Sequence, residues 1–198
     1  NNLPPKTTMA IGITSTIVGG WGSINQTQLR KLMAYSSIAN LGWTMVIFTA
    51  SPNTAALNIT MYIIMLNPTF LLIKSMNMKT LKDSSTTWTT SPMASTLLTL
   101  MFLSLSGLPP LTGFTPKLLI LNELVTQNLT PIATTMAMLS LINLFFYMRM
   151  TYIMTMTTPP IMSPTTMKWR LIMQKQKFTT ALIPMSLLTL PLLPIFTS

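Results

Sequence analysis

The run SGLPPLTGFTPK, from Ser106 to Lys117, places two adjacent prolines and two glycines inside a long stretch without other charges. Proline removes a backbone donor and clashes with the preceding helical turn, and glycine relaxes the backbone. One straight helix from Pro92 to Glu123 would reach about 48 Å, whereas a hydrocarbon core is roughly 30 Å thick. The pattern therefore predicts a helix that breaks into two halves within this run. The residues expected to form the break are Gly107, Pro109, Pro110 and Gly113.

The composition of the 198-residue chain indicates a membrane protein. Only 7% of its residues are charged and 49% are hydrophobic, whereas a soluble domain usually carries about 25% charged residues. The intervals between charges are long enough for the ~20 residues with which a helix crosses a hydrocarbon core. Turn signals divide them into six expected segments: Thr7–Gly22, Leu32–Thr49, Ala55–Ile73, Pro92–Glu123, Leu129–Tyr147 and Phe178–Phe196.

These segments predict an all-α fold, a polytopic transmembrane helix bundle of about six segments, one of them a broken helix. Strands are not expected, because an open sheet leaves its edges unsatisfied in lipid and the chain lacks the alternating pattern of a membrane barrel. We expect a single transmembrane domain over residues 1–198, with helices over 7–147, a basic loop at 148–177 and a final helix at 178–197. Because the chain begins at Asn1 without an initiator methionine, we expect it to be part of a longer protein.

The basic residues give the expected topology. If every segment crosses the membrane, ten of the twelve fall in loops on one side. These are Arg30, Lys31, Lys74, Lys79, Lys82, Arg149, Lys168, Arg170, Lys175 and Lys177. Lys6 falls on the other side, and Lys117 lies between the two faces. The positive-inside rule thus accounts for the net charge of +10, and we expect no nucleic acid as a partner.

The chain lacks the side chains that most redox and hydrolytic sites need. It has no cysteine and no histidine, which excludes thiolate-held iron–sulfur clusters, histidine-bound haem and the usual zinc sites within it. Asp83 and Glu123 are its only carboxylates. The expected topology puts them on opposite sides of the membrane, so they form neither a catalytic pair nor a metal cage. Redox or hydrolytic chemistry must therefore take place on partner chains.

Lys117 is the candidate functional residue. A cationic side chain at membrane depth is unfavourable by a few kcal/mol and raises the question of an ion or proton path. Glu123 lies about 240° around the helix from Lys117, so the two do not pair locally. Burial disfavours the charged form of lysine, which makes Lys117 a candidate proton acceptor. The alternative is passive: Lys117 snorkels to an interface or pairs with a neighbouring carboxylate.

A second polar run, NQTQLRKLMAYSSIANLGW, extends from Asn25 to Trp43. Within it Tyr35, Ser36 and Asn40 form a polar stripe, and Ser36 and Asn40 are one helical turn apart on the same face. Such a stripe could hydrogen-bond water along a path. Contact between packed membrane helices is the commoner role of Ser and Asn at such positions, so both interpretations stay open.

The runs GGWGSINQTQLRKLMAYSSIANLGW and SGLPPLTGFTPKL resemble the signatures of subunit 2 of mitochondrial NADH:ubiquinone oxidoreductase, respiratory complex I. The resemblance follows the order of the segments and covers the whole chain as the C-terminal portion of such a subunit. It implies an antiporter-like fold, with the second inverted repeat over residues 7–147 and a trailing helix. The chain departs from the family pattern at Asn40, Leu118 and Ser106, where the family has histidine, tryptophan and glycine.

This resemblance implies a membrane subunit of the proton-pumping enzyme NADH:ubiquinone reductase. Lys117 would match the proton-relay lysine on the broken helix, and the chain would hold about half of a proton path. It would carry no cofactor or metal, because NADH, FMN, iron–sulfur clusters and ubiquinone would belong to the whole complex. The expected partners are other complex I membrane subunits and the lipid bilayer, with protons and water as the only small-molecule substrates. The expected location is the mitochondrial inner membrane, with the basic loops on the matrix side.

Two other functions are compatible with the same residues. A purely structural membrane subunit would hold its neighbours in place, with Lys117 in a static ion pair. A free-standing cation/proton antiporter would share the broken helix, although the runs NQTQLRK and AYSSI resemble the complex I subunit more specifically.

Overall fold

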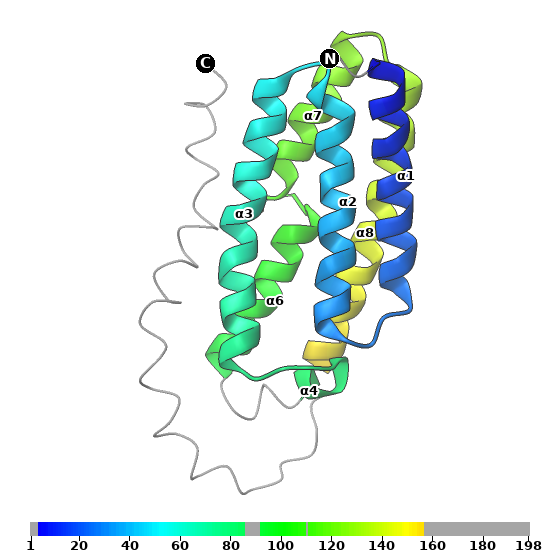
Figure 1. The fold of residues 1–198 in the computed structure, drawn as a ribbon. Coiled ribbons are helices and arrows are strands. Elements are labelled where there is room, and N and C mark those ends of the chain that lie inside the picture. The colour runs from blue at the N-terminus through cyan, green and yellow to red at the C-terminus, as the bar shows by residue number, and fades with distance from the viewer. Residues whose placement is uncertain (1–3, 86–91, 110, 157–198) are drawn as a thin grey trace, which may run out of the picture.

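The computed structural model describes residues 4–85, 92–109 and 111–156, which form a bundle of helices (Figure 1). In chain order these are α1 (Pro5–Ile24), α2 (Leu29–Phe48), α3 (Pro52–Ser75), α4 (Leu81–Ser85), α6 (Pro92–Ser106), α7 (Phe114–Thr126) and α8 (Thr130–Met156). Among these residues no strand forms, and a single isolated antiparallel bridge joins Gln28 to Thr80. The prediction of an all-α bundle is confirmed.

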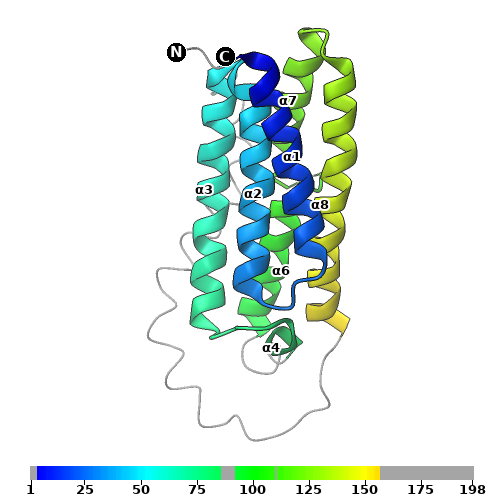
Figure 2. The same cartoon turned by 45° about the vertical axis from the view of Figure 1, so that its right-hand side comes forward.

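The long helices run alternately up and down the bundle, with α6 and α7 sharing one crossing (Figures 1 and 2). One end of the bundle is formed by the start of α2, the ends of α3 and α8, and the short helix α4. The described cations Arg30, Lys74, Lys79 and Arg149 belong to these segments or to the links beside them. We call this end of the bundle the basic end.

Helix α8 is longer than predicted. It continues to Met156, although the sequence pattern placed its end at Tyr147 and the start of a basic loop at residue 148. Phe146, Met150 and Met154 are all buried, so the apolar stripe that packs α8 into the core continues through two further turns. The charge of Arg149 does not end the helix, because its Nη1 donates to the carbonyl oxygen of Ile24 at the end of α1. The predicted final helix at 178–197 lies outside the described residues.

The predicted break of the Pro92–Glu123 segment is confirmed. Helix α6 ends at Ser106, and α7 begins only at Phe114 after a non-helical link (Figure 1). Gly107 has a φ of +82°, in the left-handed region that favours glycine. A Cβ at Gly113 would overlap the carbonyl oxygen of Ser104. Pro109 is exposed in the link, and Pro110 lies outside the described residues.

Helices α1 and α2 pack backbone to backbone along what we call the small-residue seam. A Cβ on Gly12 would lie 2.8 Å from the carbonyl oxygen of Gly42, and one on Gly19 would lie 2.6 Å from the backbone nitrogen of Ala39. Small residues allow this close approach in membrane helices, where van der Waals packing drives association. The two helices therefore form a tight pair in which glycine leaves room for the backbone or side chains of the facing helix.

The outer faces of the bundle are apolar. Large side chains that are more than half exposed include Val18, Phe48, Leu141 and Phe145, and exposed apolar surface on this scale marks an interface with lipid or protein. By length and composition, α3 and α8 are each able to cross a membrane. Both observations agree with a bundle that is embedded in a bilayer.

Candidate functional site

Lys117 lies near the start of α7, and its side chain reaches back across the helix break. Its Nζ donates a hydrogen bond to the carbonyl oxygen of Ser106 at 2.7 Å. In an uninterrupted helix that carbonyl would accept the N–H of residue 110, which is a proline and has none. The lysine side chain therefore supplies a donor that the backbone lacks.

Gly107 leaves room for this side chain. A Cβ at Gly107 would lie 2.9 Å from Lys117 Nζ and 3.1 Å from its Cδ, closer than packed atoms normally approach. The side chain of Lys117 is thus packed directly against the bare α-carbon. One glycine satisfies two requirements at once, because the same residue also adopts a positive φ.

Neutral polar groups join the two half-helices beside the lysine. The hydroxyls of Ser104 on α6 and Thr112 in the link are hydrogen-bonded at 3.1 Å. Met65 Sδ on α3 lies 3.2 Å from the Ser104 hydroxyl and 3.4 Å from the Thr112 hydroxyl, so one hydroxyl donates to the sulfur and the other donates to its neighbour. All three residues are buried, so the break is a fixed joint that packs against α3.

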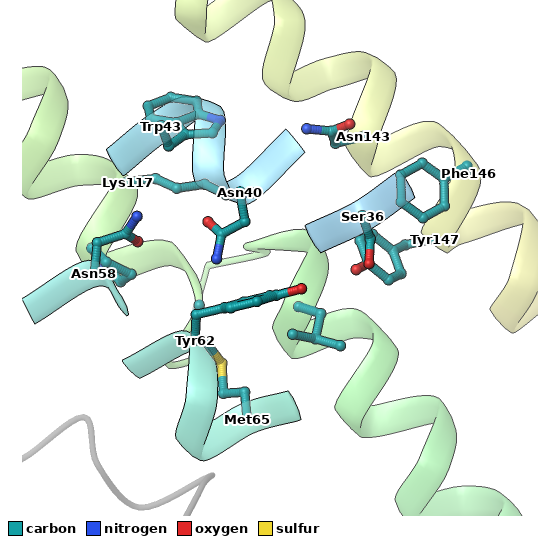
Figure 3. Close-up of a pocket in the computed structure, with 13 residues that line it drawn as sticks. Ser36, Asn40, Trp43, Asn58, Tyr62, Met65, Lys117, Asn143, Phe146 and Tyr147 are labelled. Carbon is teal, nitrogen blue, oxygen red and sulfur yellow. The ribbon is translucent and has the colours of Figure 1, made fainter. Parts of the chain in front are cut away.

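A small cavity borders Lys117 in the middle of the bundle (Figure 3). It has a volume of about 30 Å³ open to the centres of water molecules, and one water needs roughly 10–15 Å³ of such space, so about two waters fit. We call it the Lys117 cavity. Its polar lining comprises Ser36, Asn40, Trp43, Asn58, Tyr62, Lys117, Asn143 and Tyr147.

Four polar atoms of this lining are buried without a hydrogen-bond partner among the described residues. They are Trp43 Nε1, Asn58 Nδ2, Tyr62 Oη and Asn143 Oδ1. An unsatisfied buried group costs about 1–3 kcal/mol, so four around one cavity would be a large penalty unless water satisfies them. Donors and acceptors are both represented, which is what bound water needs. The Lys117 cavity is therefore built as a hydrated site.

The structure brings only some of the predicted stripe to this cavity. Ser36 and Asn40 line it together with Lys117. Ser36 donates to the carbonyl of Met33 within α2 at 2.7 Å, and its hydroxyl oxygen can still accept; the Tyr62 hydroxyl points towards it in Figure 3. Tyr35 lies elsewhere, because its ring packs over Gly22 at the seam with α1. Its predicted role as part of a polar path has no support from this placement.

Most of the wall comes from residues that the stripe on α2 does not include. Each of the helices α2, α3 and α8 contributes one polar pair with a spacing of i, i+4, which puts both side chains on one helix face. The pairs are Ser36 and Asn40, Asn58 and Tyr62, and Asn143 and Tyr147. The same i, i+4 spacing of polar residues recurs in three apolar segments. This recurrence is the sequence pattern that predicts three polar helix faces meeting at one site.

Comparison with known protein families covers residues 5–197. The family described as NADH:quinone oxidoreductase/Mrp antiporter, transmembrane, matches residues 5–145, and the C-terminus of NADH dehydrogenase subunit 2 matches residues 144–197. NADH-ubiquinone oxidoreductase chain 2 of Polypterus ornatipinnis is 46% identical over 98% of this chain and 56% of its own length. Its counterpart in Xenopus laevis is 48% identical over 82% of this chain and 47% of its own length. The chain thus spans about half the length of these relatives.

Solved structures share the fold. A chain of respiratory complex I from Thermus thermophilus with bound aureothin matches with a TM-score of 0.75 at 21% identity, over 95% of this chain and 45% of that chain. A chain of the Mrp complex from Dietzia sp. DQ12-45-1b matches with a TM-score of 0.71 at 13% identity, over 95% and 44%. The chain described here is a membrane-embedded protein and belongs to the NADH:quinone oxidoreductase/Mrp antiporter transmembrane family.

Proposed function

We propose that this chain forms part of a proton-translocating membrane subunit of NADH:ubiquinone oxidoreductase, with Lys117 as a proton relay. The observation that carries the proposal is the position of the Lys117 amine, at a helix break and beside a cavity with four unpaired polar atoms. Electron transfer from NADH to ubiquinone takes place on other subunits, which hold FMN, iron–sulfur clusters and ubiquinone. The protein lies in the mitochondrial inner membrane among other complex I membrane subunits, with its basic end towards the matrix.

A relay must gain and lose a proton without leaving its place. The hydrogen bond from Lys117 Nζ to the carbonyl oxygen of Ser106 meets this requirement, because an ammonium and a neutral amine both carry N–H donors. The amine stays anchored in either state. Its remaining N–H groups, and the lone pair of the neutral form, are available to water in the Lys117 cavity.

Nothing in the described part of the chain fixes Lys117 in its charged form. Its recorded partner is a neutral carbonyl. Asp83 belongs to α4 at the basic end, where its carboxylate accepts the backbone N–H groups of Lys79 and Thr80. A lysine without a fixed counter-charge responds strongly to charges that appear nearby. Such sensitivity would allow a reaction on other subunits to control when the proton leaves.

The cavity lining supports proton movement through water. Hydroxyl groups both donate and accept hydrogen bonds, and those of Ser36, Tyr62 and Tyr147 border the cavity. The side-chain amides of Asn40 and its neighbours on α3 and α8 do not titrate, so they orient water and do not carry the proton. Lys117 is the titratable cation in this lining, and the waters provide its contact with the rest of the path.

The test is proton pumping by the assembled complex in vesicles, with variants in the full-length subunit. Lys117→Met should reduce the protons moved per NADH oxidised while assembly persists. Lys117→Arg should fail similarly, because arginine keeps its charge but does not release its proton. Lys31→Met is the matched control, since Lys31 is an exposed lysine in the first turn of α2, and it should pump normally.

The variants separate the proposed relay from the other functions. A passive cation would be replaced well by arginine, so full pumping by Lys117→Arg would reject the relay and favour a structural subunit. Failure of Lys117→Met to assemble would also favour a structural role. A free-standing antiporter would migrate alone on native gels, whereas the proposed subunit should migrate with a very large assembly.

A further inference from the structure

A second cavity lies at the basic end, between the start of α2, the end of α3 and the link to α4. Its volume is about 380 Å³, which is within the range of roughly 300–1,000 Å³ typical of small-molecule sites. The exposed cations Arg30, Lys74 and Lys79 line it, and Asn77 adds an amide. We call it the basic-end cavity. None of the residues discussed for proton movement contributes to it.

The other wall of this cavity is apolar. Leu29, Met33 and Met78 are almost fully buried there, whereas Phe70 is 42% exposed on α3. The cavity therefore has a cationic mouth and a hydrophobic wall that continues onto the outer face of α3. This combination fits an amphiphile with an anionic head and a hydrocarbon tail.

The backbone fixes the cationic mouth. Asn77 has a φ of +53°, and the N–H groups of Asn77 and Met78 bond the carbonyls of Lys74 and Ile73, each at 3.2 Å. These two bonds form the Schellman arrangement that ends α3. The carbonyl oxygen of Lys79 then accepts the N–H of the first residue of α2 at 3.2 Å. The backbone positions of Lys74 and Lys79 are thus set independently of any ligand.

We propose that the basic-end cavity binds one anionic phospholipid, with its phosphate among Arg30, Lys74 and Lys79 and one acyl chain along Phe70. The positive-inside rule explains why basic residues lie on one side of a membrane. It does not explain why three of them line one cavity that also has a hydrophobic wall. No carboxylate lines the cavity among the described residues, and Asp83 bonds the backbone nearby. A free phosphate ion would use the mouth and leave the apolar wall in water. The proposal is independent of the role of Lys117.

The experiment uses the assembled complex in phosphatidylcholine vesicles that contain a phosphatidylglycerol with a photoreactive diazirine in one acyl chain. Crosslinked peptides are mapped by mass spectrometry, and we expect labelling at residues 70–78. A cation near an anionic lipid contributes a factor of about five to binding, so Arg30→Gln combined with Lys74→Gln should lower labelling roughly 25-fold. Lys6→Gln, which removes an exposed cation from the start of α1, is the matched control and should leave labelling unchanged.

A photoreactive phosphatidylcholine with the same acyl chain should label this segment much less, and excess inorganic phosphate should not displace the phosphatidylglycerol. Equal labelling by the two headgroups, or unchanged labelling of the double variant, would overturn the proposal. Displacement by inorganic phosphate would also overturn it, because the site would then bind a free anion. If the double variant does not assemble, the comparison of headgroups on the unchanged protein still decides the matter.

Discussion

Replacing Gly107 with alanine should disturb the Lys117 site in two separable ways. An L-residue in the left-handed conformation costs about 1–2 kcal/mol, and Gly107 has a φ of +82°. The new Cβ would lie 2.9 Å from Lys117 Nζ, the far end of a flexible side chain, so the amine would have to shift and its bond to the Ser106 carbonyl would weaken. A hydrogen bond to a charged group contributes about 1.5–3 kcal/mol. The expected loss of stability exceeds the backbone contribution of about 1–2 kcal/mol and reaches about 5 kcal/mol at most, for complete loss of the bond.

The assay is the free energy of unfolding of the full-length subunit in lipid nanodiscs, measured by titration with a denaturing detergent. Gly107→Asn carries the same Cβ, but asparagine tolerates the left-handed region better. It should therefore destabilise the subunit by the displacement of Lys117 alone. Gly107→Ala in a Lys117→Ala background should lose only the backbone contribution of about 1–2 kcal/mol, because the crowded side chain is gone.

A double-mutant cycle thus measures the contact between residues 107 and 117. A coupling energy well above the usual error of about 0.3–0.5 kcal/mol is expected for neighbours in contact. If Gly107→Ala changes stability by less than that error, the joint does not require glycine. If its effect is the same with and without Lys117, the packing of the amine against Gly107 is wrong and backbone strain accounts for the whole change.

Three further predictions follow from the same structure. Gly113→Ala should abolish assembly on native gels, because its Cβ would overlap the backbone carbonyl of Ser104; normal assembly would mean that α6 and α7 can separate. Tyr62→Phe should change stability by less than about 0.5 kcal/mol, since its hydroxyl makes no hydrogen bond of ordinary length and faces the Ser36 hydroxyl only at longer range, yet it should slow pumping and weaken the infrared signal of bound water. A stability loss of about 1 kcal/mol would instead reveal a direct bond. The backbone N–H groups of Thr80 and Lys79 hold the pKa of the Asp83 carboxyl below its usual value of 3.8. The ionised carboxylate therefore stabilises the fold above pH 3.8, and this contribution is lost as the pH falls through the pKa of the folded state. The protection of the α4 amides against exchange, corrected for the intrinsic rate at each pH, should fall on acidification, and Asp83→Asn should remove this pH dependence; an unchanged profile would contradict the bond.

The helix break was predictable because its cause is local. Adjacent prolines remove donors, and glycines permit a backbone that other residues avoid, whatever the neighbouring helices do. The partner of Lys117 was not predictable in the same way. The bond to Ser106 joins residues on either side of the break, and its geometry depends on the path of the link between them.

Most residues that line the Lys117 cavity could not be predicted from the sequence, for a different reason. Its wall is assembled from α2, α3, α6, α7 and α8, and polar spacing in one segment does not say which helices meet. The spacing does carry some information, because Tyr35 and Ser36 are adjacent and so point about 100° apart on a helix. Only one of them could face the same neighbour as Asn40. The end of α8 was missed because the charge of Arg149 resembles a loop signal, although its side chain is used to cap α1.

The small-residue seam has a mechanical consequence. Helix α1 contributes no side chain to the Lys117 cavity, yet Gly12 and Gly19 bring its backbone into close contact with α2. Ser36 and Asn40 travel with α2. A displacement of α1 by a neighbouring molecule would therefore also displace α2. It would change the width of the Lys117 cavity, although α1 does not line that cavity.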